Sequence, residues 1–265
     1  MTKNKNMKGQ VAFVCGASKG IGAATAIELS KQGVETILIA RSEEGLNDVT
    51  SKLDISSGQK HQFIIADFNN PDKLEEKVKT FLNTFDKNIQ ILVNNTGGPK
   101  PGPIMNASPS EFINTFNQHL ICNHILVNCL VKKMKEINYG RIINVISTSV
   151  KQPIKGLGVS NTIRGAVASW AKTLSFELGE FGITVNNVLP GFTDTERLHE
   201  IFKKKSKISG TDIESIIIEA QTQIPLKRFA SPSETAKAIC FLASPDADYI
   251  NGVNLPVDGG RLQTL

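Results

Sequence analysis

The chain has 265 residues, of which 40% are hydrophobic and 21% are charged, and its formal net charge is +5. This length and composition allow a sizeable buried core, and we expect one domain that spans residues 1–265. The dense basic cluster, Lys203 to Lys205 with Lys207, is not interleaved with stacking aromatic residues. A solvated helix face therefore explains the cluster better than a nucleic-acid partner does.

The sequence shows neither a secretory signal nor a membrane-spanning segment. The segment Met1–Gln10 carries three lysines but leads into no apolar run that ends in a small-residue cleavage site, so we expect no secretory signal. The longest uncharged run, Phe112 to Val131, approaches the length of a membrane span. Because this run contains seven Asn, Gln and His side chains, which hydrocarbon penalises, we expect the helix of a soluble protein and no membrane partner.

The four cysteines are scattered among apolar neighbours and form no CxxC pair; they are Cys15, Cys122, Cys129 and Cys240. This pattern favours reduced, buried thiols over a metal site or a disulfide framework. We therefore expect a cytoplasmic protein without a bound metal.

Short apolar or β-branched runs alternate with segments long enough for helices. The runs are Val11–Cys15, Thr36–Ala40, Phe63–Ala66, Ile91–Asn94, Ile142–Ser147, Thr184–Leu189 and Val253–Val257. This βαβ alternation predicts an α/β fold with a doubly wound parallel sheet of the Rossmann type, with about seven strands and helices on both faces.

Two helix starts share the sequence Ser-Pro-Ser-Glu, at Ser108–Glu111 and Ser231–Glu234. In each, Ser suits the N-cap, Pro the first helical position, and Glu the closing residue of a capping box. Apolar residues from Phe112 to Met134 recur at roughly helical spacing, which predicts one long helix.

The segment Thr195–Gln223 differs from the rest of the chain. It carries few strand signals, the lysine cluster, and the capping-box pattern Thr211-x-x-Glu214. We predict a lid-like, partly helical insertion at about residues 195–223, near a strand end. Its isoleucines suggest an apolar wall for a substrate, although helix packing explains them equally well.

A strand followed by closely spaced glycines indicates a phosphate site. Val11–Cys15 leads into Gly16, Gly20 and Gly22, which let backbone N–H groups and a helix N-terminus approach a pyrophosphate. The spacing is GxxxGxG rather than GxGxxG, and an ordinary strand-to-helix turn is the alternative.

The second predicted strand ends in Ala40 and is followed by Arg41. An Asp or Glu near this strand end would hold the ribose hydroxyls of NAD, whereas Arg suits a 2′-phosphate. Lys19 in the glycine loop adds a second positive charge. We therefore favour NADP(H) over NAD(H), with a merely solvated arginine as the alternative.

Further motifs follow in a fixed order along the chain. They are Asp67-Phe68 after the third predicted strand, Asn94-Asn95-Thr96-Gly97 after the fourth, Gly140–Asn144, Gly182–Asn186 with Pro190-Gly191, and Gly252 with Val257–Gly260. Together with the glycine loop, they make the chain resemble the short-chain dehydrogenase/reductase family from about Lys8 to Gly260. The pattern is most similar to the 3-oxoacyl-carrier-protein reductase-like members.

This resemblance implies a set of cofactor contacts at the carboxyl ends of the strands, where ordinary turns are the alternative explanation. Asp67 would face the adenine, Asn95 and Gly97 would line the adenosine ribose and pyrophosphate path, and Gly191 would flank the nicotinamide. The full implied set is Gly16, Ser18, Lys19, Gly20, Ile21, Gly22, Arg41, Asp67, Phe68, Asn95, Thr96, Gly97, Arg164, Pro190, Gly191 and Thr195.

The resemblance also implies a catalytic Asn, Ser, Tyr and Lys, in which the Tyr hydroxyl is the acid or base and the Lys lowers its pKa. Aligned without gaps from Gly140, Ser147 takes the serine position. Ser160 takes the tyrosine position, Arg164 the lysine position, and His119 the Asn position. Three of the four catalytic residue types therefore depart from the family pattern.

No shift of register restores the missing acid. The chain has two tyrosines, Tyr139 and Tyr249, and neither lies where the acid is needed. The enoyl-reductase spacing fails as well, because Leu157 stands seven residues before Arg164. Arg164 stays protonated and cannot relay a proton, but it can hold a ribose hydroxyl or a developing anion.

His119 is then the nearby group with a useful unperturbed pKa, about 6.5. Our hypothesis is that His119, or a water that it holds, supplies the proton while Ser147 and Ser160 polarise the carbonyl oxygen. A structural histidine bound by a backbone carbonyl is at least as well supported.

These observations favour an oxidoreductase that transfers a hydride between NADP(H) and a small-molecule carbonyl or alcohol substrate. The alternative is an NADP-binding subunit or sensor with little reductase activity, because the cofactor motifs are intact while the catalytic ones are altered. The resemblance further implies a homotetramer or homodimer, with the helices around Phe112–Met134 and after Gly158 at an interface.

Overall fold

The computed structural model describes residues 7–264, so the start of the Met1–Gln10 segment lies outside the described residues. Within residues 7–264, one parallel sheet has seven strands in the order β3-β2-β1-β4-β5-β6-β7. The strands are β1 (Val11–Cys15), β2 (Glu35–Ala40), β3 (Gln62–Ile65), β4 (Ile91–Asn94), β5 (Gly140–Val145), β6 (Ile183–Pro190) and β7 (Asn254–Val257). The predicted doubly wound α/β fold is confirmed.

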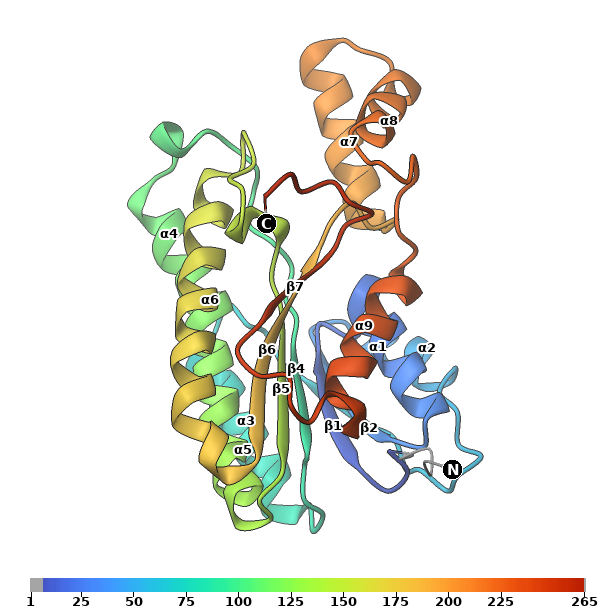
Figure 1. Cartoon of the computed structure of the whole chain (residues 1–265), viewed down its shortest axis with the longest axis vertical. Coiled ribbons are helices and arrows are strands. Elements are labelled where there is room, and N and C mark those ends of the chain that lie inside the picture. The colour runs from blue at the N-terminus through green and yellow to red at the C-terminus, as the bar shows by residue number, and fades with distance from the viewer. Residues whose placement is uncertain (1–6, 265) are drawn as a thin grey trace.

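Helices cover both faces of this sheet (Figure 1). Helices α3 to α6 lie on one face, α1, α2 and α9 on the other, and α7 with α8 project beyond one end of the sheet. The helices are α1 (Gly20–Lys31), α2 (Glu43–Thr50), α3 (Pro71–Thr84), α4 (Pro109–Phe116), α5 (Cys122–Glu136), α6 (Gly158–Leu178), α7 (Glu196–Ser209), α8 (Ile213–Thr222) and α9 (Pro232–Ala243).

The alternation of side chains along β1 explains the two layers of core. Val11, Phe13 and Cys15 are buried against one cluster, which includes residues of α3, α5 and α6. Ala12 and Val14 are buried against the other, which includes residues of α1, α2 and α9. Because both faces are covered, the strands are apolar almost throughout, as the sequence indicated.

The strand order reverses between β1 and β4. Phe13 of β1 pairs in parallel register with Ile37 of β2 on one side and with Leu92 of β4 on the other. In open α/β sheets, ligands bind in the crevice outside the carboxyl ends of the strands at such a reversal. The fold therefore directs the search for a site to the ends of β1 and β4.

Most predicted strand limits agree with the structure to within one or two residues. The largest shift is in β5, predicted as Ile142–Ser147 and observed as Gly140–Val145. The strand ends early because Ser147 caps a short 3₁₀ turn, Thr148–Val150, by accepting a hydrogen bond from the Ser149 N–H at 3.1 Å.

Both predicted Ser-Pro-Ser-Glu capping boxes are present, at the starts of α4 and α9. The predicted long helix over Phe112–Met134 is continuous from α4 to α5, but a π-helical turn, Asn117–Ile121, interrupts it. π-turns of this kind occur frequently at functional sites, and this one contains His119.

The predicted capping box at Thr211 is wrong. Asp212, not Thr211, is the N-cap of α8, and its carboxylate accepts hydrogen bonds from the N–H groups of Glu214 and Ser215 at 2.9 and 3.2 Å. The ionised carboxylate satisfies two backbone donors, which a threonine hydroxyl one residue earlier cannot reach in this geometry. In the described part of the chain, no helix is long and apolar enough to cross a membrane.

We predict that Asp212→Ala destabilises α8 locally by about 1 kcal/mol, because two backbone N–H groups lose their acceptor. Hydrogen exchange of the α8 amides measures this change. Thr211→Ala serves as the matched control and should leave the exchange rates unchanged. Equal effects of the two substitutions would contradict the assignment of the cap.

Candidate active site

The glycine loop after β1 is shaped by contacts inside the protein. Gly16 and Gly20 have φ angles of +59° and +60°, in the left-handed region that favours glycine. A Cβ on Gly16 would lie 2.6 Å from the Asn95 carbonyl oxygen, and one on Gly22 would lie 2.3 Å from the Gly16 carbonyl oxygen. The loop therefore folds closely against Asn95 at the end of β4, and side chains at these positions would displace it.

The N-terminus of α1 is open to an anion. Lys19 occupies the N-cap position without a side-chain hydrogen bond to the helix, and the first turn contains no acidic residue. The first N–H groups of the helix therefore have no acceptor from the N-cap side chain, and the helix dipole places partial positive charge at this end. This arrangement fits the pyrophosphate of a dinucleotide.

Arg41 lies at the end of β2 with an exposed side chain, directly before α2. Ser42 caps α2, where its hydroxyl accepts from the Gly45 N–H at 3.1 Å. A Cβ on Gly45 would lie 2.9 Å from the Cβ of Ser18, so α2 packs against the glycine loop. The structure thereby brings Arg41 next to the loop, as a 2′-phosphate site requires.

Of the two candidate residues shortly after β3, Asp67 is exposed and Phe68 is buried. Asp67 is exposed, and its carboxylate accepts from the Asn69 N–H at 3.0 Å. Phe68 is only 6% exposed and belongs to the core, while its carbonyl oxygen accepts from the Cys122 thiol. The side chain of Phe68 therefore belongs to the core and is not available to a cofactor, whereas Asp67 is exposed at the strand end.

Arg164, in α6, is a buried cation. Its side chain is 8% exposed, and Nη1 donates to the Val145 carbonyl oxygen at 3.0 Å. Burial lowers its pKa to about 10, so the guanidinium remains protonated at neutral pH. Among residues 7–264, no carboxylate forms an ion pair with it. An uncompensated buried cation is costly, which makes Arg164 a candidate ligand-binding group.

His119 lies close to this cation. Thr96 Oγ1 and His119 Nδ1 are 2.5 Å apart, and Nε2 is buried without a hydrogen-bond partner in residues 7–264. Burial, together with the positive charge of Arg164, lowers the pKa of His119 well below 6.5, against a smaller opposing effect of the Gly97 backbone. The imidazole is neutral at pH 7, which favours the structural alternative over an imidazolium that donates its proton to substrate.

The two candidate serines differ in their access to the cleft. Ser147 lines a large cleft at the carboxyl edge of the sheet, with Pro190, Gly191 and Thr195. Ser160 lies in the first turn of α6, is half-buried, and is not among the residues that line this cleft. Of the four predicted catalytic residues, Ser147 alone lines this cleft.

The cleft has a volume of about 1310 Å³ and lies between the sheet edge, the loop around Pro153, and the helices α7 and α8. Two polar contacts attach the start of α7 to the loops after β1 and β4. Lys19 forms an ion pair with Glu196 at 2.9 Å, and Arg197 Nη2 donates to the Pro99 carbonyl oxygen at 3.1 Å. The sequence analysis did not identify Glu196 and Arg197 as contact residues at this cleft. Their position shortly after the Pro190-Gly191 motif could have indicated it.

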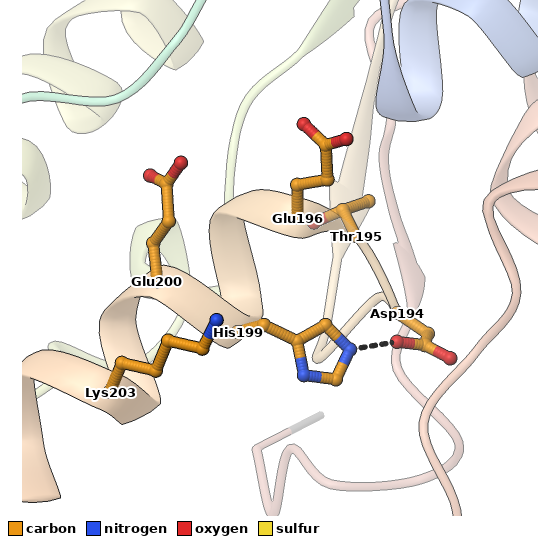
Figure 2. Close-up of a pocket in the computed structure, with 6 residues that line it drawn as sticks. All are labelled: Asp194, Thr195, Glu196, His199, Glu200 and Lys203. Carbon is orange, nitrogen blue, oxygen red and sulfur yellow. Dashed lines mark hydrogen bonds and ion pairs between the residues drawn. The ribbon is translucent and has the colours of Figure 1, made fainter.

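A smaller hollow of about 420 Å³ lies beside the first turns of α7 (Figure 2). Figure 2 shows the His199 ring turned toward Asp194, with Nε2 and Oδ1 2.7 Å apart. Its lining combines three carboxylates with Lys203 and His199, and one carboxylate, that of Asp194, is already paired with His199, so the hollow offers no single ligand chemistry.

Comparisons with known proteins agree with this geometry. A family model described as Enoyl-(Acyl carrier protein) reductase matches residues 16–261. The 3-oxoacyl-(acyl-carrier-protein) reductase FabG of Haemophilus influenzae is 31% identical over 254 residues, covering 96% of this chain and 98% of its own. The NADPH-dependent reductase BacG of Bacillus subtilis is 28% identical over 262 residues, covering 98% and 100%.

Among solved structures, the L-sorbose reductase of Gluconobacter frateurii, complexed with NADPH and L-sorbose, matches with a TM-score of 0.91 at 30% identity. It covers 99% of this chain and 100% of its own. The chain belongs to the short-chain dehydrogenase/reductase family. The predicted family, its FabG-like character and the class of oxidoreductase acting on carbonyl or alcohol groups are confirmed.

We predict that His119 makes stability depend on pH. Its folded pKa lies below the unfolded value of about 6.5, so below pH 6.5 the unfolded chain binds a proton that the folded chain does not. The free energy of unfolding should therefore fall as the pH drops below 6.5, by up to about 1.4 kcal/mol per pH unit. Above pH 6.5 this contribution is constant.

Urea unfolding at pH 5.5, 6.5 and 7.5 measures this dependence. His119→Asn should remove the added loss of stability at acid pH, whereas His124→Asn, at an exposed position, should keep it. An unchanged pH dependence in His119→Asn would show that His119 protonates equally in both states.

Proposed function

We propose that the chain is an NADP(H)-dependent reductase that interconverts a small-molecule ketone and its alcohol. The observation that carries the proposal is the uncapped N-terminus of α1 beside Arg41, in a chain of this family. Two relatives support the same cofactor: BacG is described as an NADPH-dependent reductase, and the L-sorbose reductase is complexed with NADPH. When bound, NADP(H) supplies or accepts the hydride.

The proposed cofactor contacts follow the crevice between β1 and β4. The N–H groups at the start of α1 would bind the pyrophosphate, and Arg41 with Lys19 would bind the 2′-phosphate. Asp67 would face the adenine, with Gly97 at the ribose. Pro190, Gly191 and Thr195 would flank the nicotinamide, and Thr195 is held in place as the N-cap of α7.

We propose that Ser147 orients the substrate, because its hydroxyl lines the cleft. Arg164 would stand in for the usual lysine and hold a ribose hydroxyl or stabilise negative charge that develops on the carbonyl oxygen. Ser160, in the tyrosine position, is a much weaker acid than the tyrosine it replaces, whose reference pKa is about 10. The altered catalytic set therefore keeps electrostatic stabilisation but lacks a strong acid.

The proton would then come from water in the cleft rather than from His119. His119 is neutral and its Nε2 is buried. In this role the histidine positions the Thr96 hydroxyl and lies beside Arg164. Its substitution should alter the rate without removing an ionisation near pH 6.5 from the pH profile.

We propose that residues 195–223 form the substrate lid. Helices α7 and α8 pack against each other through a small core of their own, formed by Leu198, Phe202, Ile216 and Ala220. This pair contacts the glycine loop through Glu196 and the loop after β4 through Arg197. A lid with its own core can move as a unit when these polar contacts break.

The proposed assembly is a homodimer or homotetramer. Large apolar side chains are exposed on the helices that the sequence placed at an interface, with Ile113 60%, Phe116 38% and Phe176 77% exposed. Such side chains favour burial against a second copy. A cytoplasmic location, suggested by the cysteines, also remains a prediction.

We predict that Arg41→Ala raises the Kd for NADPH about tenfold and leaves the Kd for NADH within about twofold. The reason is the loss of a charge-assisted contact with a group that only NADPH carries. Fluorescence titration with both nucleotides measures the two affinities. Lys79→Ala, an exposed cation on α3, is the control, and an equal loss for both nucleotides in Arg41→Ala would rule out the 2′-phosphate role.

We predict NADPH consumption with at least one member of a panel of ketones, β-ketoacyl thioesters and sugars. Ser147→Ala should lower kcat about 100-fold for that substrate while the Kd for NADPH stays unchanged. NADPH binding without turnover on any panel member would favour the nucleotide-binding subunit or sensor instead.

A further inference from the structure

The cleft beneath α7 and α8 carries a strong excess of positive charge. Its lining includes six cationic side chains and one carboxylate, that of Glu219. Glu219 is already paired with Lys205 at 3.0 Å, so it does not offset the other cations. A concave site with this balance of charge attracts anionic ligands.

Arg261 differs from the other cations of the cleft. Lys204 and Lys155 are exposed, and Arg197 donates to backbone carbonyl oxygens. Arg261 is half-buried, and its guanidinium lies over the Phe192 ring at 4.4 Å from the centroid. Its Nη2 donates to the Gln223 side-chain oxygen at 3.5 Å, a neutral partner. Burial lowers the pKa of Arg261, against an opposing effect of Asp258, and no ion pair with a carboxylate is formed within residues 7–264.

The backbone fixes Arg261 in this position. The carboxylate of Asp258 accepts from the Gly260 N–H at 3.0 Å and from the Leu262 N–H at 2.8 Å. Gly259 and Gly260 have φ angles of +65° and +83°, so the chain turns sharply after β7. Asp258 therefore builds the turn that carries Arg261 into the cleft, and its oxygens are occupied by backbone donors.

Arg261 also lies near the end of the cleft where reaction is proposed to occur. The Gly191 N–H donates to the Val257 carbonyl oxygen at 2.9 Å, which joins the ends of β6 and β7. Phe192, beneath the guanidinium, directly follows the Pro190-Gly191 segment that would flank the nicotinamide. Ser147 lines the same cleft as Arg261.

The remaining walls are largely apolar. Leu157 comes from the loop before α6, while Leu198, Ile201 and Phe202 come from α7. A ligand that matches these walls has a hydrocarbon body and one anionic group. A planar guanidinium held over an aromatic ring presents paired N–H donors to a carboxylate.

We propose that Arg261 is the anion-binding residue of the substrate pocket and that the substrate is an oxo acid with an apolar chain. The carboxylate binds Arg261 and the ketone lies toward Ser147. This inference rests on the proposed function, because it names the substrate class of the same site. The other cations of the cleft attract the acid but do not fix its position.

The test measures binding, which does not depend on turnover. Calorimetric titrations use 2-, 4- and 7-oxooctanoate, their methyl esters, and octyl phosphate, with and without NADP⁺. At least one acid should bind about tenfold or more tightly than its ester. Arg261→Gln should remove that preference without changing ester affinity, and Arg261→Lys should keep part of it.

Lys207→Gln is the matched control, because Lys207 is an exposed cation of α7 that does not line the cleft. It should preserve the preference for the acid. Equal affinity of acids and esters in the wild type would overturn the inference. An equal loss of acid and ester affinity in Arg261→Gln would overturn it as well. So would a result in which octyl phosphate, but no oxo acid, depends on Arg261 for binding. Arg261-dependent binding of an oxo acid without NADPH consumption would instead count against the proposed reductase activity.

Discussion

The site depends on how the loop after β1 is held against the end of β4. The Asn95 side-chain amide donates to the Cys15 carbonyl oxygen at 3.2 Å, and the loop can approach it only because Gly16 and Gly22 lack side chains. This contact joins the ends of β1 and β4, where the strand order reverses, next to the N-terminus of α1, whose N-cap residue Lys19 makes no side-chain hydrogen bond to the helix. The proposed pyrophosphate site depends on this arrangement.

Arg164 and His119 give the candidate active site an unusual charge distribution. Burial, together with the positive charge of Arg164, lowers the pKa of His119 and keeps it neutral. Within residues 7–264, no carboxylate forms an ion pair with the buried Arg164. A lysine in the same place could deprotonate more readily, whereas a guanidinium is a permanent positive charge. This charge distribution fits the proposed role of Arg164 in stabilising negative charge, and it does not fit proton donation by His119.

The helices α7 and α8, the proposed substrate lid, line the cleft together with Ser147. Glu196 contacts the glycine loop and Arg197 contacts the loop after β4, while Leu198, Ile201 and Phe202 of α7 form an apolar wall of the cleft. The C-terminal turn built by Asp258 places Arg261 at the end of that wall. Segments far apart in the sequence thus combine to define one cleft.

The sequence by itself determined the fold class, the succession of strands and helices along the chain, both Ser-Pro-Ser-Glu caps and the glycine loop. These features depend on local periodicity and on short-range hydrogen bonds. It did not determine that Asp212 replaces Thr211 as a cap, since the local geometry chooses between neighbouring acceptors. Only the tertiary structure decided that His119 is neutral and that Arg261 faces the cleft. Burial and charge at those atoms come from residues distant in the sequence, which no local pattern encodes.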